Sequence, residues 1–415
     1  MREMKDSGVD SIGFIPFEWR NTRLKYLCSI TTGDSDTQDA TPKGKYPFYV
    51  RSPIVERSDK FTFEGDGILI AGDGAGAGRI FHRVHGKYAV HQRVYRLYDF
   101  KNVNIDFIYH YLESLFPNEM DRGSAQSTVP SIRLPMLTNL QVALPPIEEQ
   151  SLIVSFVSEK VDAITEAIAR HRSIIEKLEE YKKSVITQAV TKGLNPDVEM
   201  KDSGVKFVGM IPVNWTVQRL KFCLSESLKY GANESGINYN ENLPRYIRIT
   251  DITEDGKLKE ADKLSLTIEQ ANNYILKDKD ILLARSGATV GKSFLYKKEY
   301  GIAAFAGYLI KATVNEKLLP EYFNYITQSS YYSLWKDWIF SQATIQNIGA
   351  DKYNQLPTVI PSIEEQIDIT NYLDNKCAKI AEAISRQKAA IGKLEEYKKS
   401  LIYNAVTGKI DCRNA

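Results

Sequence analysis

Cysteine and long apolar runs are both scarce in this chain. Four cysteines occur among 415 residues, and no two of them form a CxxC pair. Their wide spacing argues against a zinc ribbon and a disulfide framework, and it fits a reducing compartment. No apolar run approaches the ~18 residues of a membrane span, and the polar start MREMKDSG carries no signal peptide. We therefore expect a soluble, cytoplasmic protein with no membrane partner.

An excess of charge of one sign is also missing. Lys and Arg number 54 and Asp and Glu 52, so the formal net charge is only +2. The whole-chain charge gives no argument for nucleic-acid binding, and any such argument must rest on local segments. The length suggests roughly two to four domains, and each half is long enough to bury its own core.

The chain contains a long internal repeat. Residues 145–190 and 361–406 match without a gap at an offset of 216, and KLEEYKKS is identical in both copies. The stretch MKDSGV at 4–9 returns at 200–205, and each copy is followed by Ile-Pro and a tryptophan. The chain is therefore a tandem duplication with pseudo-two-fold character.

Each repeat divides into a globular part and a helix. Short apolar runs separated by turns fill residues 31–144 and predict strands, whereas 105–116 has a helical period. This composition indicates a strand-rich α+β domain. Residues 200–360 repeat the pattern with variation, with a helix expected over 321–336. The expected divisions of the chain are 1–144, 145–195 (the first long helix), 196–360 and 361–415 (the second long helix).

Each long helix has a heptad-like apolar seam. The first seam is Val157, Val161, Ile164, Ile168, Ile175, Leu178 and Val185, and the second is Leu373, Cys377, Ile380, Ile384, Ile391, Leu394 and Leu401. Polar residues interrupt both seams at matching places, His171 and Lys182 in one and Gln387 and Lys398 in the other. The pattern is typical of a coiled coil and predicts that the two helices pack on each other. Separate packing of each helix on its own domain is the alternative.

Motifs for catalysis or cofactor binding fail on their spacing. RSGATVGKS at 285–293 has one residue too few between its glycines for a P-loop. PDVEMK at 196–201 holds its two acidic residues too close together for a nuclease site. His82, His85 and His91 lie among no cysteine or acidic residue, and the other half has no matching histidines. We expect no catalytic residue, no metal site and no cofactor bound by this chain.

The most informative local segment is RIFHRVHGKYAVHQRVYRLY, residues 79–98. It has no acidic residue and interleaves basic with aromatic side chains. We expect a hairpin with one face on the core and one on an anionic backbone, and a merely solvated face is the alternative. Gln92 and Arg93 are candidates for reading adenine and guanine edges. The glycine run at 72–78 is expected to form a tight turn between strands, where the backbone can approach a ligand.

Two alignments connect the globular halves. PFYVR at 47–51 aligns with PRYIR at 244–248, and GILIAGDGAGAGRIF aligns with DILLARSGATVGKSFL at an offset of 213. The copies differ at Gly72-Asp73 against Arg285-Ser286, and at His91-Gln92 against Ala304-Phe305, where sequence specificity would lie. The candidate DNA-binding residues are Arg51, Gly74, Gly78, Arg79, Arg83, Lys87, Gln92, Arg93, Arg248, Arg285, Ser286 and Lys292.

Together these segments resemble the specificity subunit of a type I restriction–modification system. The resemblance covers essentially the whole chain. It rests on the tryptophan lead-in before each half, on P-[PS]-I-E-E-Q opening each long helix, and on KLEEYKKS with AVT and a glycine closing it. It implies an α+β fold in which two strand-rich target-recognition domains are joined by two long antiparallel coiled-coil helices, related as a pseudo-two-fold tandem repeat.

The resemblance also implies a function. Each domain would read one half of a bipartite, asymmetric site in double-stranded DNA, and the helices would set the spacer and dock methyltransferase subunits. The chain itself would be non-catalytic. Two methyltransferase and two restriction (motor-nuclease) subunits would be its partners, with S-adenosylmethionine, ATP and Mg bound by those partners. The alternative is a coiled-coil protein-interaction adaptor that reads no DNA, and an enzyme in its own right has little support from the motifs.

Overall fold

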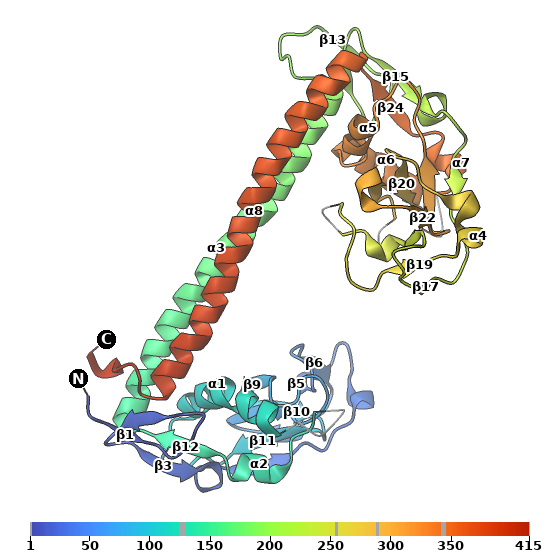
Figure 1. Ribbon diagram of the computed structural model, residues 1–415. Helices are drawn as coiled ribbons and strands as arrows, with labels where there is room; N and C mark the ends of the chain where they lie inside the picture. Colours follow the sequence, from blue (N-terminus) through green and yellow to red (C-terminus); the bar gives the residue numbers. More distant parts are fainter. Residues whose placement is uncertain (1, 124–129, 254–255, 288–289, 342–345, 415) are drawn as a thin grey trace. The chain divides into compact units, whose positions relative to one another are not determined.

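The computed structural model describes residues 2–123, 130–253, 256–287, 290–341 and 346–414. They form two compact units. Unit 1 comprises Met1–Arg172 and Lys388–Ala415, and unit 2 comprises Ser173–Gln387. Each unit therefore contains one globular part and a segment of each long helix (Figure 1). Within the described residues, no helix is both long enough and apolar enough to cross a membrane.

Unit 1 combines two four-stranded sheets with a covering helix. Its strands are β1 (Met4–Asp6), β2 (Phe14–Pro16), β3 (Arg20–Arg23), β4 (Ser29–Thr32), β5 (Tyr46–Tyr49), β6 (Glu56–Ser58), β7 (Phe63–Glu64), β8 (Gly67–Ala71), β9 (Phe81–Val84), β10 (Lys87–Val90), β11 (Val94–Tyr98) and β12 (Gln141–Leu144). Its helices are α1 (Ile105–Gly123), α2 (Leu134–Thr138), the first part of α3 (Ile147–Lys192) and the last part of α8 (Ile363–Val406).

The two sheets of unit 1 have the strand orders β6-β5-β10-β7 and β4-β11-β8-β9. Among the named strands described in this unit, only β5 and β10 form a parallel pair. Strand β8 is buried along its length, and Ile68 and Ile70 share a core with Phe107 and Tyr111 of α1. Continuous apolar sequence is typical of a strand covered on both faces.

Unit 2 repeats this scaffold. Its strands are β13 (Met200–Asp202), β14 (Met210–Pro212), β15 (Thr216–Arg219), β16 (Lys229–Tyr230), β17 (Ile237–Asn238), β18 (Arg245–Ile247), β19 (Leu264–Ser265), β20 (Ile281–Ala284), β21 (Ser293–Leu295), β22 (Ala303–Phe305), β23 (Leu309–Ala312) and β24 (Pro357–Ile360). Its short helices are α4 (Ile268–Ala271), α5 (Pro320–Ile326), α6 (Ser330–Ser341) and α7 (Ala350–Tyr353). The sheet orders are β16-β23-β20-β21 and β17-β19-β18-β22, and β18–β22 is a parallel pair like β5–β10.

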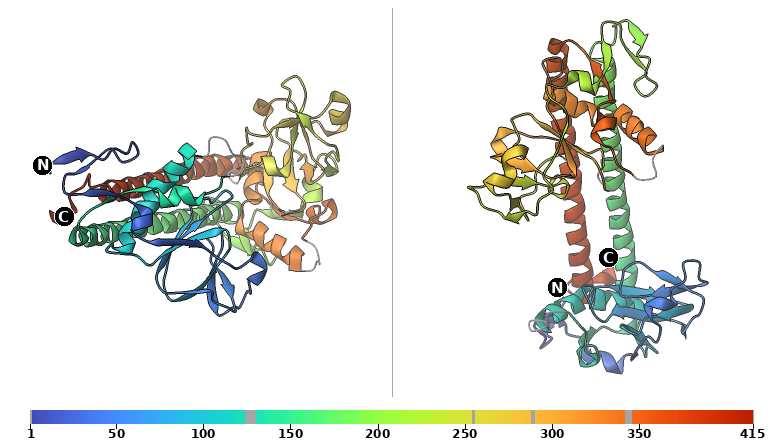
Figure 2. Two further views of the ribbon diagram at one scale, coloured as in Figure 1. Left: turned by 90° about the horizontal axis from the view of Figure 1, so that it is seen from below. Right: turned by 90° about the vertical axis from the view of Figure 1, so that its right-hand side faces the viewer.

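The long helices α3 and α8 pack on each other in both units, as the seams predict. In unit 1, Ile164 and Ile168 share a buried cluster with Leu401, and Arg172 approaches Glu395 at 3.7 Å. In unit 2, the Lys376 ammonium lies 5.5 Å from the centre of the Tyr181 ring. In unit 1 the first part of α3 meets the last part of α8, and in unit 2 the last part of α3 meets the first part of α8. The two helices are therefore antiparallel (Figure 2).

Two expectations about the elements are wrong. The segment 79–98 is not a hairpin, because β9 pairs with β8 whereas β10 joins β5 and β7 in the other sheet. The helix expected over 321–336 is two helices, α5 and α6. Residues 327–329 separate them, and Ser329 Oγ accepts a hydrogen bond from Tyr332 N at 3.3 Å, as an N-terminal cap does.

The repeated motifs close each unit through one recurring contact. In unit 1, Trp19 is buried and its Nε1 donates to Glu149 of the IEEQ motif at 3.1 Å. In unit 2, Trp215 donates to Glu365 in the same way at 3.0 Å. We call each tryptophan–glutamate pair a latch, because it fastens the lead-in to the start of a long helix.

The glutamine of each IEEQ motif ties the long helix to the globular part. The Gln150 Oε1 accepts from Asn104 N at 2.7 Å, just before α1 begins. The Gln366 Oε1 accepts from Leu319 N at 2.8 Å, just before α5 begins. Both side chains are buried, so these bonds satisfy polar groups that water cannot reach.

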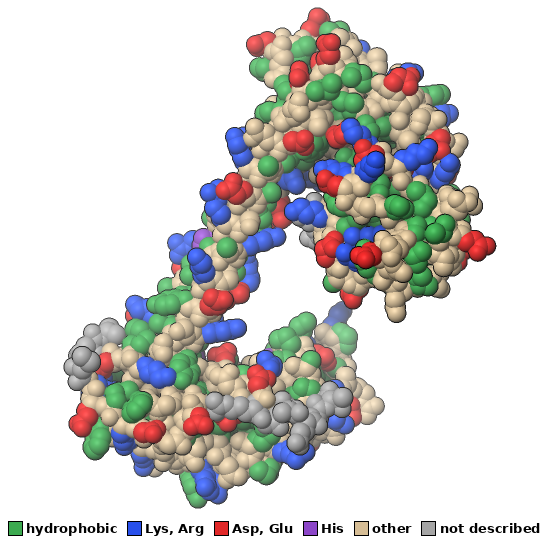
Figure 3. Space-filling view, viewed as in Figure 1, with side chains coloured by type: hydrophobic (Ala, Val, Ile, Leu, Met, Phe, Trp, Pro, Cys, Tyr) green, Lys and Arg blue, Asp and Glu red, His purple; other side chains and the backbone are tan. Residues whose placement is uncertain are grey.

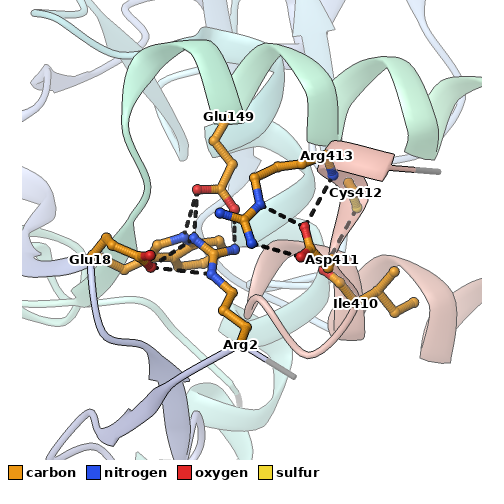
Figure 4. A network of polar contacts seen from close by, with 8 residues as sticks. Arg2, Glu18, Glu149, Ile410, Asp411, Cys412 and Arg413 are labelled. Atoms are coloured by element: carbon orange, nitrogen blue, oxygen red, sulfur yellow. Dashed lines mark hydrogen bonds and ion pairs between the residues drawn. The ribbon is translucent and has the colours of Figure 1, made fainter.

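The latch of unit 1 carries an additional ionic network (Figure 4). The Arg2 guanidinium bonds to Glu149 and to Glu18. Beside them, Arg413 donates to Asp411 at 2.8 Å and 2.7 Å. The Arg413 hydrogen bonds lower the pKa of Asp411 to about 2. Residues from both ends of the chain therefore meet at this latch.

Candidate nucleic-acid interface

The candidate site of unit 1 lies where three loops converge beside the parallel strand pair. Because β5 and β10 run in the same direction, the loops that follow them leave the same edge of the sheet. His91 N donates to Tyr49 O at 3.0 Å, and Gly72 N donates to Arg93 O at 2.9 Å. These bonds bring the loops after β5, β8 and β10 together. Loops held by a rigid scaffold are common places for binding residues.

Two arginines share one carboxylate at this convergence. Arg51 Nη1 donates to Asp73 Oδ1 at 2.7 Å, and Arg93 Nη1 donates to Asp73 Oδ2 at 2.6 Å. The side chains of Arg51, Arg93 and Asp73 are 44%, 62% and 14% exposed. Partial burial opposes ionisation of Asp73, but the hydrogen bonds from both arginines lower its pKa. We call this trio the clasp, and it carries one net positive charge.

A hydrogen bond to the buried His91 side chain holds the turn that carries Gln92 and Arg93. His91 is buried, and its Nδ1 accepts from Arg93 N at 3.0 Å. Burial, with the nearby Arg51 charge, lowers the pKa of His91, which favours the neutral acceptor form. Gln92 is exposed and donates to Asp36 Oδ2 at 3.0 Å. Of the twelve predicted residues, Arg51, Gln92 and Arg93 thus lie close together.

Gly74 and Gly78 form the predicted turn between β8 and β9, and that expectation is confirmed. Their φ angles are +76° and +66°, a conformation that glycine adopts without strain. Gly74 neighbours Asp73 of the clasp. Gly78 has a different place: it is buried, and a side chain there would meet Met120 at 2.4 Å.

The remaining predicted cations of unit 1 lie elsewhere. Arg79 pairs with exposed Asp121 of α1. Arg83 lies between two carboxylates, Asp66 at 2.8 Å and Asp106 at 2.7 Å, and Lys87 lies over the Phe61 ring. The segment 79–98 lacks acids of its own, but acids from other segments pair with it. Basic and acidic side chains are accordingly interspersed on the face shown in Figure 3.

The sheet register corrects the alignment of the two halves. His91 N donates to Tyr49 O in unit 1, and Ala306 N donates to Ile247 O in unit 2. His91 therefore corresponds to Ala306, not to Ala304, and Arg51 corresponds to Ile249, not to Arg248. A one-residue slip in a strand moves a side chain to the opposite face. Arg248 instead forms two hydrogen bonds to Asp251, at 2.7 Å and 3.0 Å, which stabilise its own turn.

Arg285 and Ser286 occupy the corresponding edge of unit 2. Arg285 N donates to Tyr308 O at 3.0 Å, as Gly72 N does to Arg93 O, so Ser286 corresponds to Asp73 and Tyr308 to Arg93. The Arg285 guanidinium lies 4.8 Å from the Tyr230 ring centre. Its buried Nε has no hydrogen-bond partner, and it forms no ion pair with any residue that the structure describes.

Tyr230 and Tyr308 were missed by the sequence interpretation. The Tyr230 Oη accepts from Ala350 N at 3.0 Å, which holds the ring under Arg285. Tyr308 is 65% exposed. An exposed aromatic ring can stack on a base or support a cation, and only the sheet register places Tyr308 at this edge.

Lys292 lies apart from Arg285. It lines a cavity of about 440 Å³ in unit 2, together with Lys182 of α3 and Asp374 of α8. The three histidines considered as metal ligands, His82, His85 and His91, have separate partners. His82 approaches Ser52 O, and His85 approaches Asp66. Over the described ranges, no group of three or more histidine, cysteine or acidic residues is arranged to hold a metal ion.

Two parts of the chain match one family model, the type I restriction modification DNA specificity domain. The matched residues are 16–180 and 221–391, one part for each repeat. The two matches agree with the fold, which has two α+β units that each carry a segment of both long helices. The chain is therefore a protein with two DNA specificity domains. The chain belongs to the type I restriction modification DNA specificity family.

Similar proteins extend over nearly the whole chain. The Type I restriction enzyme EcoDI specificity subunit of Escherichia coli is 23% identical over 96% of this chain and 90% of its own length. The MjaVIII specificity subunit of Methanocaldococcus jannaschii is 23% identical over 96% of this chain and 95% of its own. A solved chain from work on complex assembly of the type I R-M system has a TM-score of 0.70 at 16% identity. The match covers 95% of this chain and 99% of that one. The likeness confirms the α+β fold with two long helices.

Proposed function

We propose that this chain is the DNA-recognition subunit of a type I restriction–modification complex. Each unit reads one half of a split, asymmetric site in double-stranded DNA, and the helices set the unread gap. One observation carries the proposal: the same edge of the same scaffold holds different side chains in the two units. Unit 1 has the clasp, and unit 2 has Arg285 with Tyr230 and Tyr308. Equal scaffolds with unequal edges are what reading two unlike half-sites requires.

The partners in this proposal are two methyltransferase subunits and two restriction subunits. S-adenosylmethionine, ATP and Mg belong to those partners, and this chain performs no catalysis. Exposed apolar side chains on the long helices support docking of protein there. Tyr181 of α3 is 47% exposed, and Tyr397, the matching residue of α8, is 57% exposed. Exposed aromatic side chains are common in protein interfaces.

A methylome tests the proposal. The chain is co-expressed with its methyltransferase subunit in a host without adenine methylation, and methylated positions are determined by single-molecule sequencing. We expect one bipartite motif with a fixed gap. A second variant has residues 31–144 replaced by the equivalent segment of a relative, and it should change one half-site only. A continuous motif, or changes in both half-sites, contradicts the proposal.

The adaptor alternative makes an opposite prediction. If both globular parts bind only protein, reversing the charge of Arg93 and Arg285 leaves the DNA affinity of the assembled complex unchanged. If they read DNA, Arg93→Glu and Arg285→Glu each weaken binding. An electrophoretic mobility assay with the assembled complex distinguishes the two. Lys206→Glu, a charge reversal of the same sign at an exposed lysine in the lead-in of unit 2, serves as the control.

A further inference from the structure

We infer that Asp73 positions Arg51 and Arg93 to read a G·C base pair in the half-site of unit 1. The inference rests on the proposed function and names the base pair and the positioning residue. Asp73 touches no DNA in this arrangement. It acts through the two guanidinium groups that it holds.

The carboxylate of the clasp stands on a fixed backbone. Asp73 bridges to Ser131, and the residue before it, Gly72, is bonded on both sides. Gly72 N donates to Arg93 O at 2.9 Å, and Gly72 O accepts from Ile132 N at 2.7 Å. A Cβ at position 72 would meet Arg93 O at 2.6 Å, so only glycine allows this approach. The Asp73 side chain is only 14% exposed, whereas both arginine side chains extend into solvent.

Most donors of the clasp are available. A guanidinium has five N–H donors in a fixed fork. Among the described residues, the side chains of Arg51 and Arg93 each donate one hydrogen bond, to Asp73. The remaining donors are enough for the two parallel bonds that arginine makes to guanine O6 and N7.

The charge of the clasp favours a base over a phosphate. Phosphate contacts gain much of their strength from neutralising charge, and here Asp73 already compensates half of the arginine charge. A carboxylate-held guanidinium keeps its directional donors while losing conformational freedom. Asp73 therefore weakens binding of the two arginines to phosphate, but it fixes the orientation of their guanidinium groups. A fixed orientation is what discrimination between bases requires.

Unit 2 lacks this device and supplies an internal control. Ser286 stands where Asp73 stands, and no carboxylate pairs with Arg285 among the residues that the structure describes. Asp121, paired with Arg79 in unit 1, supplies a matched control of the same chemical type. Its pair is exposed on both sides and lies outside the clasp.

The experiment compares methylomes of four chains, each co-expressed with the methyltransferase subunit: wild type, Asp73→Asn, Arg93→Lys and Asp121→Asn. We expect the half-site of unit 1, identified by replacing residues 31–144, to contain a G·C pair. Asp73→Asn and Arg93→Lys should each lower the preference for that pair roughly 5- to 150-fold. The other positions of this half-site and the whole second half-site should stay unchanged, as should both half-sites in Asp121→Asn.

The outcomes separate the inference from the proposed function. A wild-type chain that marks no split motif overturns both. A split motif without a G·C pair in the first half-site overturns the inference alone. So do unchanged preferences in Asp73→Asn and Arg93→Lys, or equal relaxation in Asp121→Asn. Relaxation of one base pair also excludes a folding defect, because an unfolded unit 1 abolishes methylation at every site.

Discussion

Glu149 and Glu365 occupy the same place in the repeat but have different hydrogen-bond partners. Both accept a hydrogen bond from the tryptophan of their latch. Glu149 also pairs with Arg2, and both of those side chains are only 8% exposed. Glu365 instead accepts from Ser362 Oγ at 2.9 Å in a capping box at the start of α8. Removing the charge should therefore affect unit 1 more than unit 2.

We expect Glu149→Gln to lower the free energy of unfolding by about 1–3 kcal/mol, because the buried Arg2 guanidinium loses a charged partner. Glu365→Gln is the matched control. It keeps an amide oxygen for Trp215 and should cost less than about 1 kcal/mol. Urea unfolding of both variants measures the difference. Equal losses in the two variants would show that Arg2 adds nothing to the first latch.

Glu226 gives unit 2 a dependence on acid. Hydrogen bonds from Lys229 and then Lys311 lower the pKa of Glu226 to about 2, below its usual value of 4.5. A depressed pKa in the folded state stabilises the fold above about pH 4.5. That stability is lost as the pH falls toward 2.

We expect Glu226→Gln to flatten the stability of unit 2 between about pH 4.5 and 2, since the neutral amide does not titrate. Thermal unfolding across this pH range measures the slope for wild type and variant. Glu316→Gln, at an exposed glutamate of the same unit, serves as the control. A slope that Glu226→Gln leaves as steep as in wild type refutes the assignment.

At the scale of elements, the long helices were the most predictable feature. The repeated stretches 145–190 and 361–406 come within two residues of the observed ends of α3 and α8, and their heptad seams predict helix throughout because such a pattern constrains every turn. Short strands carry much less information. Strands of three to five residues fit either a hairpin or two separate sheets, and β9 and β10 take the second arrangement. The parallel register of β18 and β22 also lies outside what local sequence encodes.

Two glycines of α8 and its end should respond oppositely to alanine. Gly408 has φ +73°, and a Cβ there would lie 2.4 Å from Pro16, so Gly408→Ala should destabilise unit 1 by about 1–3 kcal/mol. Gly392 lies within the helix with open space around it, so Gly392→Ala should stabilise by about 0.5–1 kcal/mol. Thermal unfolding of the two variants measures both shifts. Shifts of the same sign would contradict this assignment of the two backbone positions.

At the scale of the whole molecule, the duplication was predictable and the division of the site was not. Repeated motifs revealed two scaffolds, and the family match confirms them. The partners of the predicted cations come from distant sequence. Asp73 is 22 residues from Arg51, and Asp121 is 42 residues from Arg79. A local count of charges finds such arginines but not the acids that neutralise them, so it overestimated the basic face of residues 79–98.

A matched insertion in both long helices tests the spacer. We insert one heptad after Ser173 in α3 and one after Lys388 in α8, where the seams are half-buried. The end of α3, which buries Ile186, Ala189 and Val190, stays intact. Seven residues at ~1.5 Å each add about 10 Å, or roughly three base pairs at 3.4 Å. The methylome should show both half-sites unchanged with a longer gap. An insertion in α3 alone mismatches the seams and should abolish methylation. A changed half-site in the double insertion would contradict a spacer role for the helices.

The two latches have a consequence for how new specificities arise. Trp19 touches the start of α3 through Glu149 and the end of α8 near Gly408, and Trp215 touches Glu365 and Gly193 in the same way. Each globular part is thus attached in the same way to the start of one long helix and to the end of the other. Genetic exchange of the segment between two latches transfers a whole globular part together with the residues that attach it to both long helices. From n such globular parts, recombination assembles n squared ordered pairs. Each new pair would recognise a different split site without any point mutation in the gene.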